Sequence, residues 1–322
     1  MKRLKVAVIG FGVMGKYHAN VYAALPHTDL VAVVDPDPGR CIEAETSYDV
    51  RSFTHPEAVL KNVALDAVSI AAPTSLHYDL TKTFLEAGVH VLVEKPAATD
   101  VAQAQKLANL SRRRGLILQV GHITRFYRSI QLLSERVREP YLIEARRLTP
   151  NARIKDAGAI LDLMIHDIDI LLGLVQSDIE EVTVAGKILN GSLYEDVAAA
   201  QIVFKNGCIA RLLASRVAPD AERSLVIAEA KQTLRLDFGK DPHTEIAVYQ
   251  PVGDDTGNNH VNVDRIVVRE DNPLRSELEH FLARIRGTEP PIGTLDDDLR
   301  SLRLATRLIQ QLKAKRPAEL SY

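Results

Sequence analysis

The sequence is short of cysteine, of long apolar runs and of any surplus of one charge. Its 322 residues include two cysteines, Cys41 and Cys208. These are too few for a disulfide framework, and we expect both to be buried free thiols. No stretch approaches the roughly 18 apolar residues that a helix needs to cross a bilayer. The first residues run directly into a strand without a cleavage signal, so we expect a cytoplasmic protein with no signal peptide and no membrane contact.

The balance of charge excludes the partners that strongly basic proteins bind. Lysine and arginine number 40 against 42 aspartates and glutamates, for a net charge of -2. We therefore expect neither nucleic acid nor a membrane surface as a partner. Hydrophobic residues make up 46% of the chain and charged residues 25%, which is typical of a soluble globular protein. The length is sufficient for two domains.

The first 122 residues alternate between predicted strands and predicted helices. The strands are continuous runs of Val, Ile, Ala and Leu, which is typical of a parallel sheet buried on both faces. These strands are Leu4–Ile9, Leu30–Val34, Asp66–Ala72, His90–Val93 and Leu116–Val120. The helices between them are Val13–Leu25, Gly39–Ser47, Ser75–Ala87 and Val101–Arg114. Repeated strand–helix–strand units predict a doubly wound Rossmann domain over residues 1–122.

The remaining residues, 123–322, predict a second domain of α+β type, so that the fold class is α/β overall. Four helices are expected at Tyr127–Val137, Ala159–Val175, Leu274–Arg286 and Leu295–Ala314. The strands are expected at Tyr141–Leu148, Glu181–Leu189, Asp196–Phe204, Cys208–Arg216, Arg223–Glu229, Thr233–Phe238, Glu245–Gln250 and Val261–Val268. Tight-turn signals such as Lys205-Asn206-Gly207 join several of them. They predict a large open sheet, mostly antiparallel.

A glycine-rich loop follows the first strand and opens the first helix. Its residues are Gly10, Phe11, Gly12, Val13, Met14 and Gly15. In this context the glycines allow a tight turn, close approach of a pyrophosphate and close packing of helix on strand. Asp35 lies 20 residues after Gly15 at the end of the second strand, where a carboxylate accepts both ribose hydroxyls of NAD and repels the 2′-phosphate of NADP. We therefore predict NAD as the cofactor, with Arg40 as a nearby cation that weakens this preference.

Lys95 follows the fourth strand, at the sheet edge where doubly wound folds bind ligands. A lysine there is also compatible with a solvated surface charge. On the apolar helix 159–175, Asp162, His166 and Asp169 share one face. Burying such groups costs several kcal/mol unless they are partnered. A structural cluster, a metal site and an active-site face could each explain them, but so few ligands argue against a metal, and we predict none.

The chemistry of these residues fits the oxidation of a secondary alcohol. His166 has the ordinary pKa of a general base near neutral pH. Asp162 could orient the imidazole or hold the substrate, and Lys95 could bind the reacting oxygen. We predict that these three side chains form the catalytic set.

The same residues resemble the Gfo/Idh/MocA family of oxidoreductases over essentially the whole chain. The matching segments are the glycine loop with His18, Ala72-Pro73-Thr74-Ser75-Leu76-His77, Glu94-Lys95-Pro96, and Asp162-x-x-x-His166-Asp167-Ile168-Asp169. The resemblance implies that Lys95, Asp162 and His166 are catalytic. It also implies that Ala72, Pro73, His77, Glu94 and Lys95 line the cofactor.

Within the family, several further segments are similar to those of UDP-N-acetylglucosamine 3-dehydrogenases. These segments are Gly121-His122-Ile123-Thr124-Arg125-Phe126, Arg153-x-x-Asp156, Glu195-Asp196-Val197 and Ala214-Ser215-Arg216. The likeness implies oxidation of C3 of a UDP-sugar to a ketone. An aminotransferase that uses pyridoxal phosphate would then install an amino group for lipid A or another surface polysaccharide.

A pyrophosphate favours planar arginine donors. Arg125, Arg153, Arg216 and Arg223 are therefore candidate substrate-binding residues beside Lys95, Asp162 and His166, and His122 could line the cleft. Each arginine is equally compatible with a surface or interface ion pair.

Two other functions remain compatible with the sequence. One is an NAD-dependent dehydrogenase of a free sugar or cyclitol of the inositol type. The other is a cofactor-sensing protein without activity, since a fold does not imply a function. In each case the exposed face of the large sheet predicts a homodimer or homotetramer built through that sheet.

Overall fold

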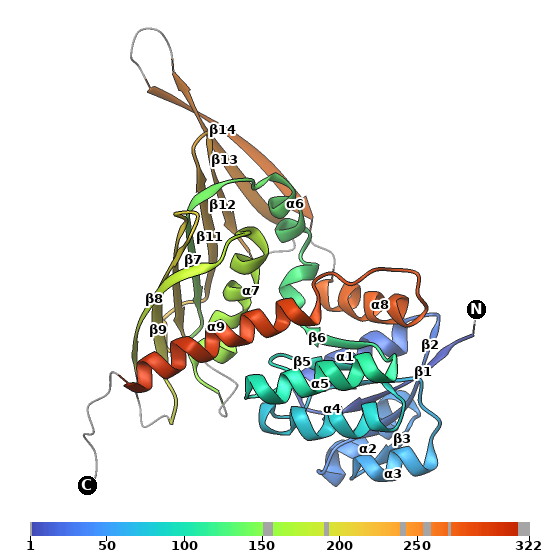
Figure 1. Ribbon diagram of the computed structural model, residues 1–322. Coiled ribbons are helices and arrows are strands. Elements are labelled where there is room, and N and C mark those ends of the chain that lie inside the picture. Colours follow the sequence, from blue (N-terminus) through green and yellow to red (C-terminus); the bar gives the residue numbers. More distant parts are fainter. Residues whose placement is uncertain are drawn as a thin grey trace. The chain divides into compact units, whose positions relative to one another are not determined.

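The computed structural model describes residues 2–150, 157–189, 193–238, 243–253, 259–269 and 272–314 (Figure 1). The chain divides into two compact units. One contains Met1–Ile123 and Asn272–Leu299, and the other contains Thr124–Asp271 and Arg300–Tyr322. Among the described helices, none combines the length and apolar content that crossing a bilayer requires.

The first unit is built on a parallel sheet, as the sequence predicts. Its strands are β1 (Leu4–Ile9), β2 (Thr28–Val34), β3 (Arg51–Phe53), β4 (Ala67–Ile70), β5 (His90–Glu94) and β6 (Leu118–Gly121). They lie in the order β3-β2-β1-β4-β5-β6, and every neighbouring pair is parallel. The chain reverses its direction across the sheet between β1 and β4. In such sheets the ligand crevice opens at this switch point, beyond the carboxyl ends of the strands.

Helices cover both faces of this sheet, which explains the continuous apolar strands. The helices of the unit are α1 (Val13–Ala24), α2 (Pro38–Tyr48), α3 (Pro56–Asn62), α4 (His77–Glu86), α5 (Val101–Arg114) and α8 (Pro273–Ile285). On β1, Val8 joins a core with Tyr22 of α1, whereas Ile9 joins a separate core with Phe84 of α4. Successive residues of one strand therefore face opposite layers.

Helix α8 corrects the predicted division of the chain at residue 122. Its apolar residues Leu274, Leu278 and Phe281 recur at helical spacing and pack into the core that contains Val8 and Tyr22. The Asn272 side chain accepts a hydrogen bond from the Arg275 N–H and so caps the helix. Residues 272–299 were assigned to the second domain, but they belong to the first unit, where the apolar stripe of α8 packs against α1.

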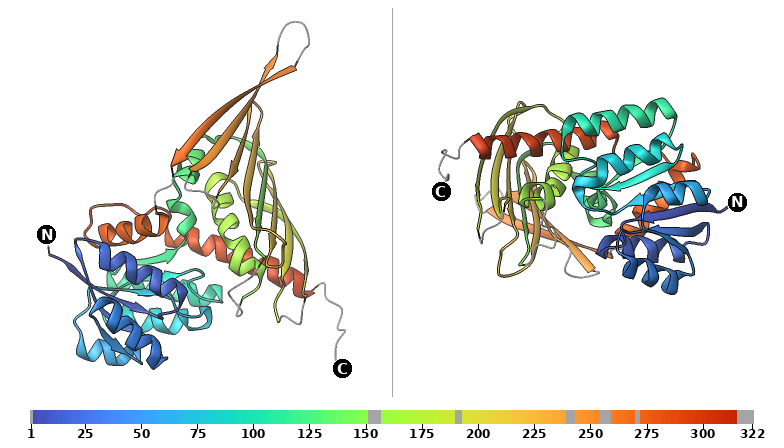
Figure 2. Two further views of the ribbon diagram at one scale, coloured as in Figure 1. Left: turned by 180° about the vertical axis from the view of Figure 1, so that it is seen from behind. Right: turned by 90° about the horizontal axis from the view of Figure 1, so that it is seen from below.

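The second unit contains the predicted large sheet. Its strands are β7 (Pro140–Leu148), β8 (Ile179–Lys187), β9 (Val197–Phe204), β10 (Ile209–Ser215), β11 (Glu222–Glu229), β12 (Gln232–Asp237), β13 (His243–Gly253) and β14 (Asn259–Arg269). They lie in the order β14-β13-β12-β11-β7-β10-β9-β8. Among the strand pairs of the described residues, only that of β10 with β7 is parallel, so the prediction of an open, mostly antiparallel sheet is confirmed. Two views of the molecule show the strands side by side (Figure 2).

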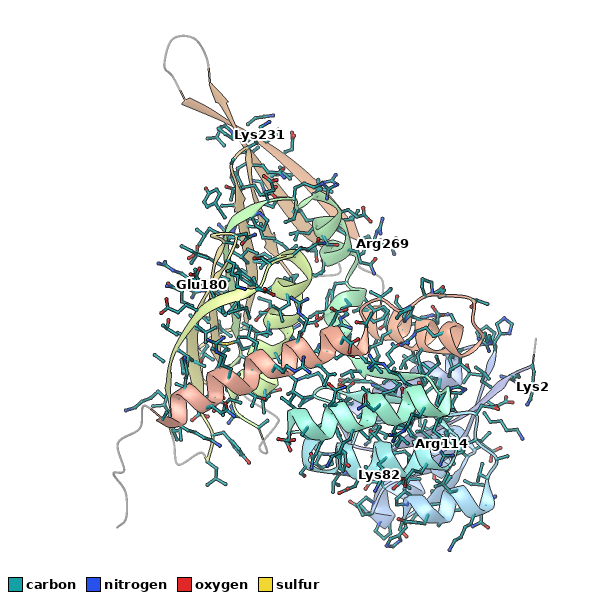
Figure 3. The ribbon with its side chains drawn as sticks, in the orientation of Figure 1. Lys2, Lys82, Arg114, Glu180, Lys231 and Arg269 are labelled. Atoms are coloured by element: carbon teal, nitrogen blue, oxygen red, sulfur yellow. The ribbon has the colours of Figure 1, made fainter. Side chains whose placement is uncertain are left out.

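One face of this sheet packs against helices. They are α6 (Arg128–Arg136), the π-helical turn η3 (Ile160–Met164), α7 (Ile165–Leu174) and the part of α9 (Leu295–Ala314) that follows Leu299. Ile143 of β7, Leu212 of β10 and Ile168 of α7 share the core between them. The charged residues Glu180, Lys231 and Arg269 are exposed on the strands and turns of the sheet (Figure 3).

Candidate active site

The glycine-rich loop has the backbone geometry that a dinucleotide requires. Gly10 has a φ of +89°, and a Cβ atom on it would lie 2.8 Å from the Ala71 carbonyl oxygen. A Cβ atom on Gly15 would lie 1.8 Å from the Gly10 carbonyl oxygen. A Cβ atom on Gly12 would meet nothing within 4 Å, so open space borders the loop where α1 begins. The free N–H groups of that helix end and this space fit the pyrophosphate of NAD.

Asp35 lies directly beside this loop. Its carboxylate is buried and accepts hydrogen bonds from the Phe11 N–H (2.7 Å) and the Asp37 N–H (2.9 Å). The half-exposed Arg40 guanidinium lies 3.4 Å from Asp35 Oδ2. The two backbone donors fix the carboxylate at the carboxyl end of β2, where an adenosine ribose would bind.

The other predicted cofactor residues divide into exposed and buried groups. Val13 and Met14 begin α1 with exposed side chains. The Phe11 side chain is buried, and its ring packs edge-on against the Tyr48 ring at 6.1 Å. Only the backbone of Phe11 can therefore contact a cofactor. Ala72 and Pro73 follow β4, at the same end of the sheet.

His77 connects two segments at the carboxyl end of the sheet, and its contact with the cofactor stays a prediction. It is buried at the start of α4, and its ring nitrogens lie 2.7 Å from the Pro96 carbonyl oxygen and 2.8 Å from the Ala72 carbonyl oxygen. The imidazole ring lies between these two carbonyl groups, so His77 links the segment after β4 to the segment after β5. The Lys95–Pro96 peptide bond in that second segment is cis.

Glu94, the residue before Lys95, has its hydrogen-bond partner, His18 of α1, within the first unit. Its Oε1 lies 3.1 Å from His18 Nε2. Burial raises the pKa of the Glu94 carboxyl, but the hydrogen bond and charge of His18, with the charges of Lys95 and His77, outweigh this and place the pKa below its ordinary value. Directly after the next strand, β6, His122 is buried 3.7 Å from Asp298 within the same unit. Contact of His122 with a substrate stays a prediction.

In the second unit, Asp162 and His166 belong to one continuous helical segment. Asp162 lies within the π-helical turn η3, and His166 lies in the first turn of α7. The Ile165 N–H donates to the Ile160 carbonyl, five residues earlier, which is the π-helical pattern. Such turns often occur at functional sites. The turn changes how far Asp162 is rotated relative to His166 from what a regular α-helix would give.

The other acidic residues of this helix pair with arginines. The Asp167 carboxylate accepts hydrogen bonds from Arg147 Nη2 (2.6 Å) and Nε (3.1 Å), and the Phe238 ring lies 5.4 Å from that guanidinium. The Asp169 carboxylate pairs with Arg125 and also accepts a hydrogen bond from Ser301 Oγ (3.1 Å). Asp169 therefore belongs to a satisfied ion pair, and Arg125 is committed to that pair rather than placed for a pyrophosphate.

A second cluster anchors the start of the helix. Ile160 N–H donates to Glu195 Oε1 (3.0 Å), and Ala159 N–H donates to the Glu195 carbonyl (2.8 Å). The buried Arg216 guanidinium donates to the Ala157 carbonyl and to Asp196 Oδ1. These bonds correct the prediction that Arg216 binds substrate, because its donors are directed at the protein interior.

Two of the predicted substrate arginines keep that role as a prediction. Arg223 is exposed on β11 directly opposite Arg147 of β7, so both lie on the face of the sheet that carries α7. Arg153 lies outside the described residues.

Arg147 and Gly158 were not singled out from the sequence, and Asp167 and Glu195 were named only within matching segments, without a role of their own. One signal was available for Arg147, because it follows the inward positions Ile143 and Ala145 at strand spacing. A charge at such a position requires a buried partner.

Known proteins resemble both units. A model of the oxidoreductase family with an NAD-binding Rossmann fold matches residues 4–122, and a GFO/IDH/MocA C-terminal domain matches residues 130–235. The UDP-N-acetylglucosamine 3-dehydrogenase of Acidithiobacillus ferrooxidans is 33% identical over 292 residues, which cover 90% of this chain and 91% of that protein. The chain belongs to the Gfo/Idh/MocA family. It is an oxidoreductase, and its first unit is the NAD-binding domain of that family.

Structural comparison agrees with this assignment. A crystal form of the same A. ferrooxidans enzyme superposes with a TM-score of 0.86 at 30% identity and covers 98% of this chain and 99% of that one. Inositol dehydrogenases of the family are also similar. The scyllo-inositol 2-dehydrogenase (NAD(+)) of Bacillus subtilis is 27% identical over 99% of this chain and 96% of that protein.

Proposed function

We propose that this oxidoreductase uses NAD⁺ to oxidise the C3 hydroxyl of UDP-N-acetylglucosamine to the 3-keto sugar. The observation that carries the proposal is the likeness to the A. ferrooxidans UDP-N-acetylglucosamine 3-dehydrogenase, which extends at 33% identity over 90% of this chain. The geometry of the glycine loop and Asp35 supports a dinucleotide as cofactor.

Three side chains of this chain perform the proton chemistry of the proposal. His166 accepts the proton of the C3 hydroxyl. Lys95 binds the same oxygen and stabilises its developing negative charge. Asp162 orients His166 or the sugar. Bound NAD⁺ supplies the acceptor for the hydride that leaves C3.

The UDP group would bind in the second unit. Arg223 is exposed on the helix-bearing face of the sheet, and a guanidinium there could bind a pyrophosphate oxygen. Arg223→Ala and Arg153→Ala should each raise KM for UDP-N-acetylglucosamine about tenfold or more, which corresponds to the loss of roughly 1.4 kcal/mol or more of binding. Arg235→Ala, an exposed arginine on the opposite face of β12, should leave KM unchanged.

The decisive experiment is a substrate screen. Purified protein is mixed with NAD⁺ and either UDP-sugars or free polyols, and NADH is followed by its absorbance. A pyridoxal-phosphate aminotransferase with glutamate removes the ketone and draws the reaction forward. Turnover of UDP-N-acetylglucosamine that disappears in Lys95→Ala and His166→Ala is the expected result. Normal turnover in both variants would refute the catalytic assignment.

A second candidate is the oxidation of a free cyclitol or sugar. The similarity to scyllo-inositol 2-dehydrogenase over 99% of this chain favours it. In that case myo- or scyllo-inositol would be oxidised and UDP-N-acetylglucosamine would not, and Arg223→Ala would change neither kcat nor KM. A chain that binds NAD but oxidises no member of either set would be the cofactor-sensing protein.

The setting of the proposed reaction follows from its product. A 3-keto UDP-sugar is a substrate for an aminotransferase, and the 3-amino product would supply amide-linked acyl chains to lipid A or another surface polysaccharide. We place the enzyme in the cytoplasm as a homodimer or homotetramer. The sheet face opposite α7 carries the half-buried apolar side chains Leu142, Leu213 and Val226, which supports association through that face. A single monomer peak in light scattering would contradict it.

A further inference from the structure

A chain of hydrogen bonds crosses the interior of the first unit and ends on Glu94. Tyr22 Oη lies 2.8 Å from Ser69 Oγ, Ser69 Oγ lies 3.1 Å from His18 Nδ1, and His18 Nε2 lies 3.1 Å from Glu94 Oε1. Tyr22, Ser69 and His18 are completely buried. The chain begins on α1, passes through β4 and reaches the carboxyl end of β5, so it connects three elements of the dinucleotide-binding fold.

The direction of the bond to Glu94 follows from the chemistry of its carboxylate. A carboxylate only accepts hydrogen bonds, so His18 Nε2 donates to it. Ser69 Oγ bridges His18 Nδ1 and Tyr22 Oη, and the tautomer of His18 sets the direction of these two bonds. This arrangement satisfies every group in the chain, which buried polar groups require. Burial also raises the pKa of Tyr22, so its hydroxyl keeps its proton. The chain therefore fixes the carboxylate and favours its ionised form.

The topology places this carboxylate on the nicotinamide side of the cofactor. Asp35 at the end of β2 is the ribose acceptor of the adenosine half, and the loop after β1 takes the pyrophosphate. The other half of the dinucleotide must then extend away from β2, toward the carboxyl ends of β4 and β5. Glu94 is the last residue of β5, and Lys95 follows it.

We propose that Glu94, positioned by His18, strengthens the binding of NAD⁺ relative to NADH. The oxidised nicotinamide ring carries a positive charge that the reduced ring lacks. A Lys95 ammonium beside the oxidised ring would repel it, and the adjoining carboxylate offsets that repulsion. In a partly buried site one such charge changes affinity by about tenfold or more. The inference rests on the proposed function only in that Lys95 acts beside the nicotinamide.

The test measures binding of the two cofactor forms without any sugar. The dissociation constant of NADH is obtained from its fluorescence, and that of NAD⁺ from competition with NADH. Glu94→Gln keeps the size of the side chain and removes its charge. We expect the dissociation constant of NAD⁺ to rise about tenfold while that of NADH changes less than about twofold. Glu86→Gln, an exposed glutamate on α4 that pairs with Lys82, is the matched control and should change neither constant.

Substitutions of the hydrogen-bonded residues separate the role of His18 from that of the Glu94 charge. His18→Leu removes the donor to Glu94 and should shift the ratio of the two constants in the same direction. Tyr22→Phe leaves the His18–Glu94 bond in place and should not shift it. The melting temperature with and without NADH establishes that each variant is folded. Equal weakening of both cofactor forms by Glu94→Gln, or an unchanged ratio in both Glu94→Gln and His18→Leu, would overturn the proposal.

These outcomes are distinct from failure of the proposed function. A shifted ratio in a protein that does not oxidise UDP-N-acetylglucosamine refutes the substrate and leaves the role of Glu94 intact. If the protein oxidises the UDP-sugar but Glu94→Gln and His18→Leu leave the ratio of the NAD⁺ and NADH dissociation constants unchanged, the proposed function stands and the role of Glu94 is refuted.

Discussion

The guanidinium of Arg125 meets the carboxylate of Asp169 through two hydrogen bonds, 2.8 Å from Nε to Oδ2 and 2.6 Å from Nη2 to Oδ1. Asp169 lies about one turn after His166 on the same helix. Because a two-point contact fixes direction as well as distance, the pair fixes the rotation of α7 about its axis. The Arg147–Asp167 pair fixes the same helix against the central strand of the sheet.

Loss of Arg125 should destabilise the protein. Arg125→Met leaves the buried Asp169 carboxylate without its principal cation, and removing one partner of a buried pair costs about 3 kcal/mol. Arg125→Lys should recover little, because an ammonium cannot make the two-point contact. Urea denaturation measures the free energy of unfolding, with the exposed Arg136→Met on α6 as control. Unchanged stability combined with a raised KM would restore Arg125 as a substrate ligand.

Gly158→Ala should damage the start of the helical segment that carries Asp162 and His166. The new Cβ would lie 2.2 Å from Glu195 Oε1, so the carboxylate must move away from the Ile160 N–H. We expect a loss of about 2 kcal/mol of stability, as for other overpacked sites, and a fall in kcat. Gly173→Ala on α7 is the matched control, because its Cβ meets nothing within 4 Å. That variant should gain about 0.5–1 kcal/mol. Equal stability of the two variants would contradict the role of Glu195.

Asp35→Ala should weaken NAD binding and reduce the preference for NAD over NADP. The variant loses the acceptor of the ribose hydroxyls and the negative charge that repels a 2′-phosphate. Arg40, which lies 3.4 Å from Asp35 Oδ2, then becomes a cation for that phosphate. Fluorescence titration with NADH and NADPH gives both dissociation constants. The double variant Asp35→Ala with Arg40→Ala should bind NADPH less tightly than Asp35→Ala alone. Equal binding of NADPH by the two variants would exclude Arg40 as the cation for the 2′-phosphate.

Acid should destabilise the first unit through His90. Burial lowers the pKa of His90, and Asp66 offsets this only in part. His90 Nδ1 accepts a hydrogen bond from the Ile117 N–H (2.9 Å), and protonation of that nitrogen breaks the bond. Below about pH 6.5 the unfolded chain takes up a proton that the folded protein does not, so the free energy of unfolding falls as the pH falls.

The measurement for His90 is urea denaturation at pH 7.5 and pH 5.5. His90→Asn keeps an acceptor for Ile117 and does not titrate, so its stability should fall less over this interval. Part of the pH dependence of the unfolding free energy should remain in His90→Asn, because burial also lowers the pKa of His280. An identical pH dependence of the wild type and His90→Asn would exclude His90 as a contributor.

The sequence predicted the features that depend on local pattern. The apolar run of Leu4–Ile9, the glycine loop and the turn at Lys205-Asn206-Gly207 each specify a backbone conformation from neighbouring residues, and the structure has each of them. The short strand β3 and helix α3 were missed because a three-residue strand has almost no periodicity. The membership of α8 in the first unit was missed because an amphipathic helix does not indicate which core it covers.

The ion-pair partners of the buried arginines could not be predicted from the sequence. Arg125 pairs with a residue 44 positions away and Arg216 with one 20 positions away, and only the folded sheet brings them together. Arg125, Arg216 and Arg223 looked alike as candidates for an anionic substrate. Only burial and hydrogen bonding separate the first two, which anchor the helical segment that carries Asp162 and His166, from the third, which is exposed.

Because α8 belongs to the first unit although it lies near the end of the sequence, it affects how that unit folds during protein synthesis. The layer that contains Val8 and Tyr22 is complete only when Leu278 and Phe281 have been added, and these residues emerge from the ribosome after nearly the whole chain. A nascent chain that ends near residue 123 therefore lacks the α8 residues of that layer, and the apolar side chains that they cover are exposed. We therefore expect the first unit to complete its folding only after α8 has been synthesised. A truncated protein that ends near residue 123 should aggregate.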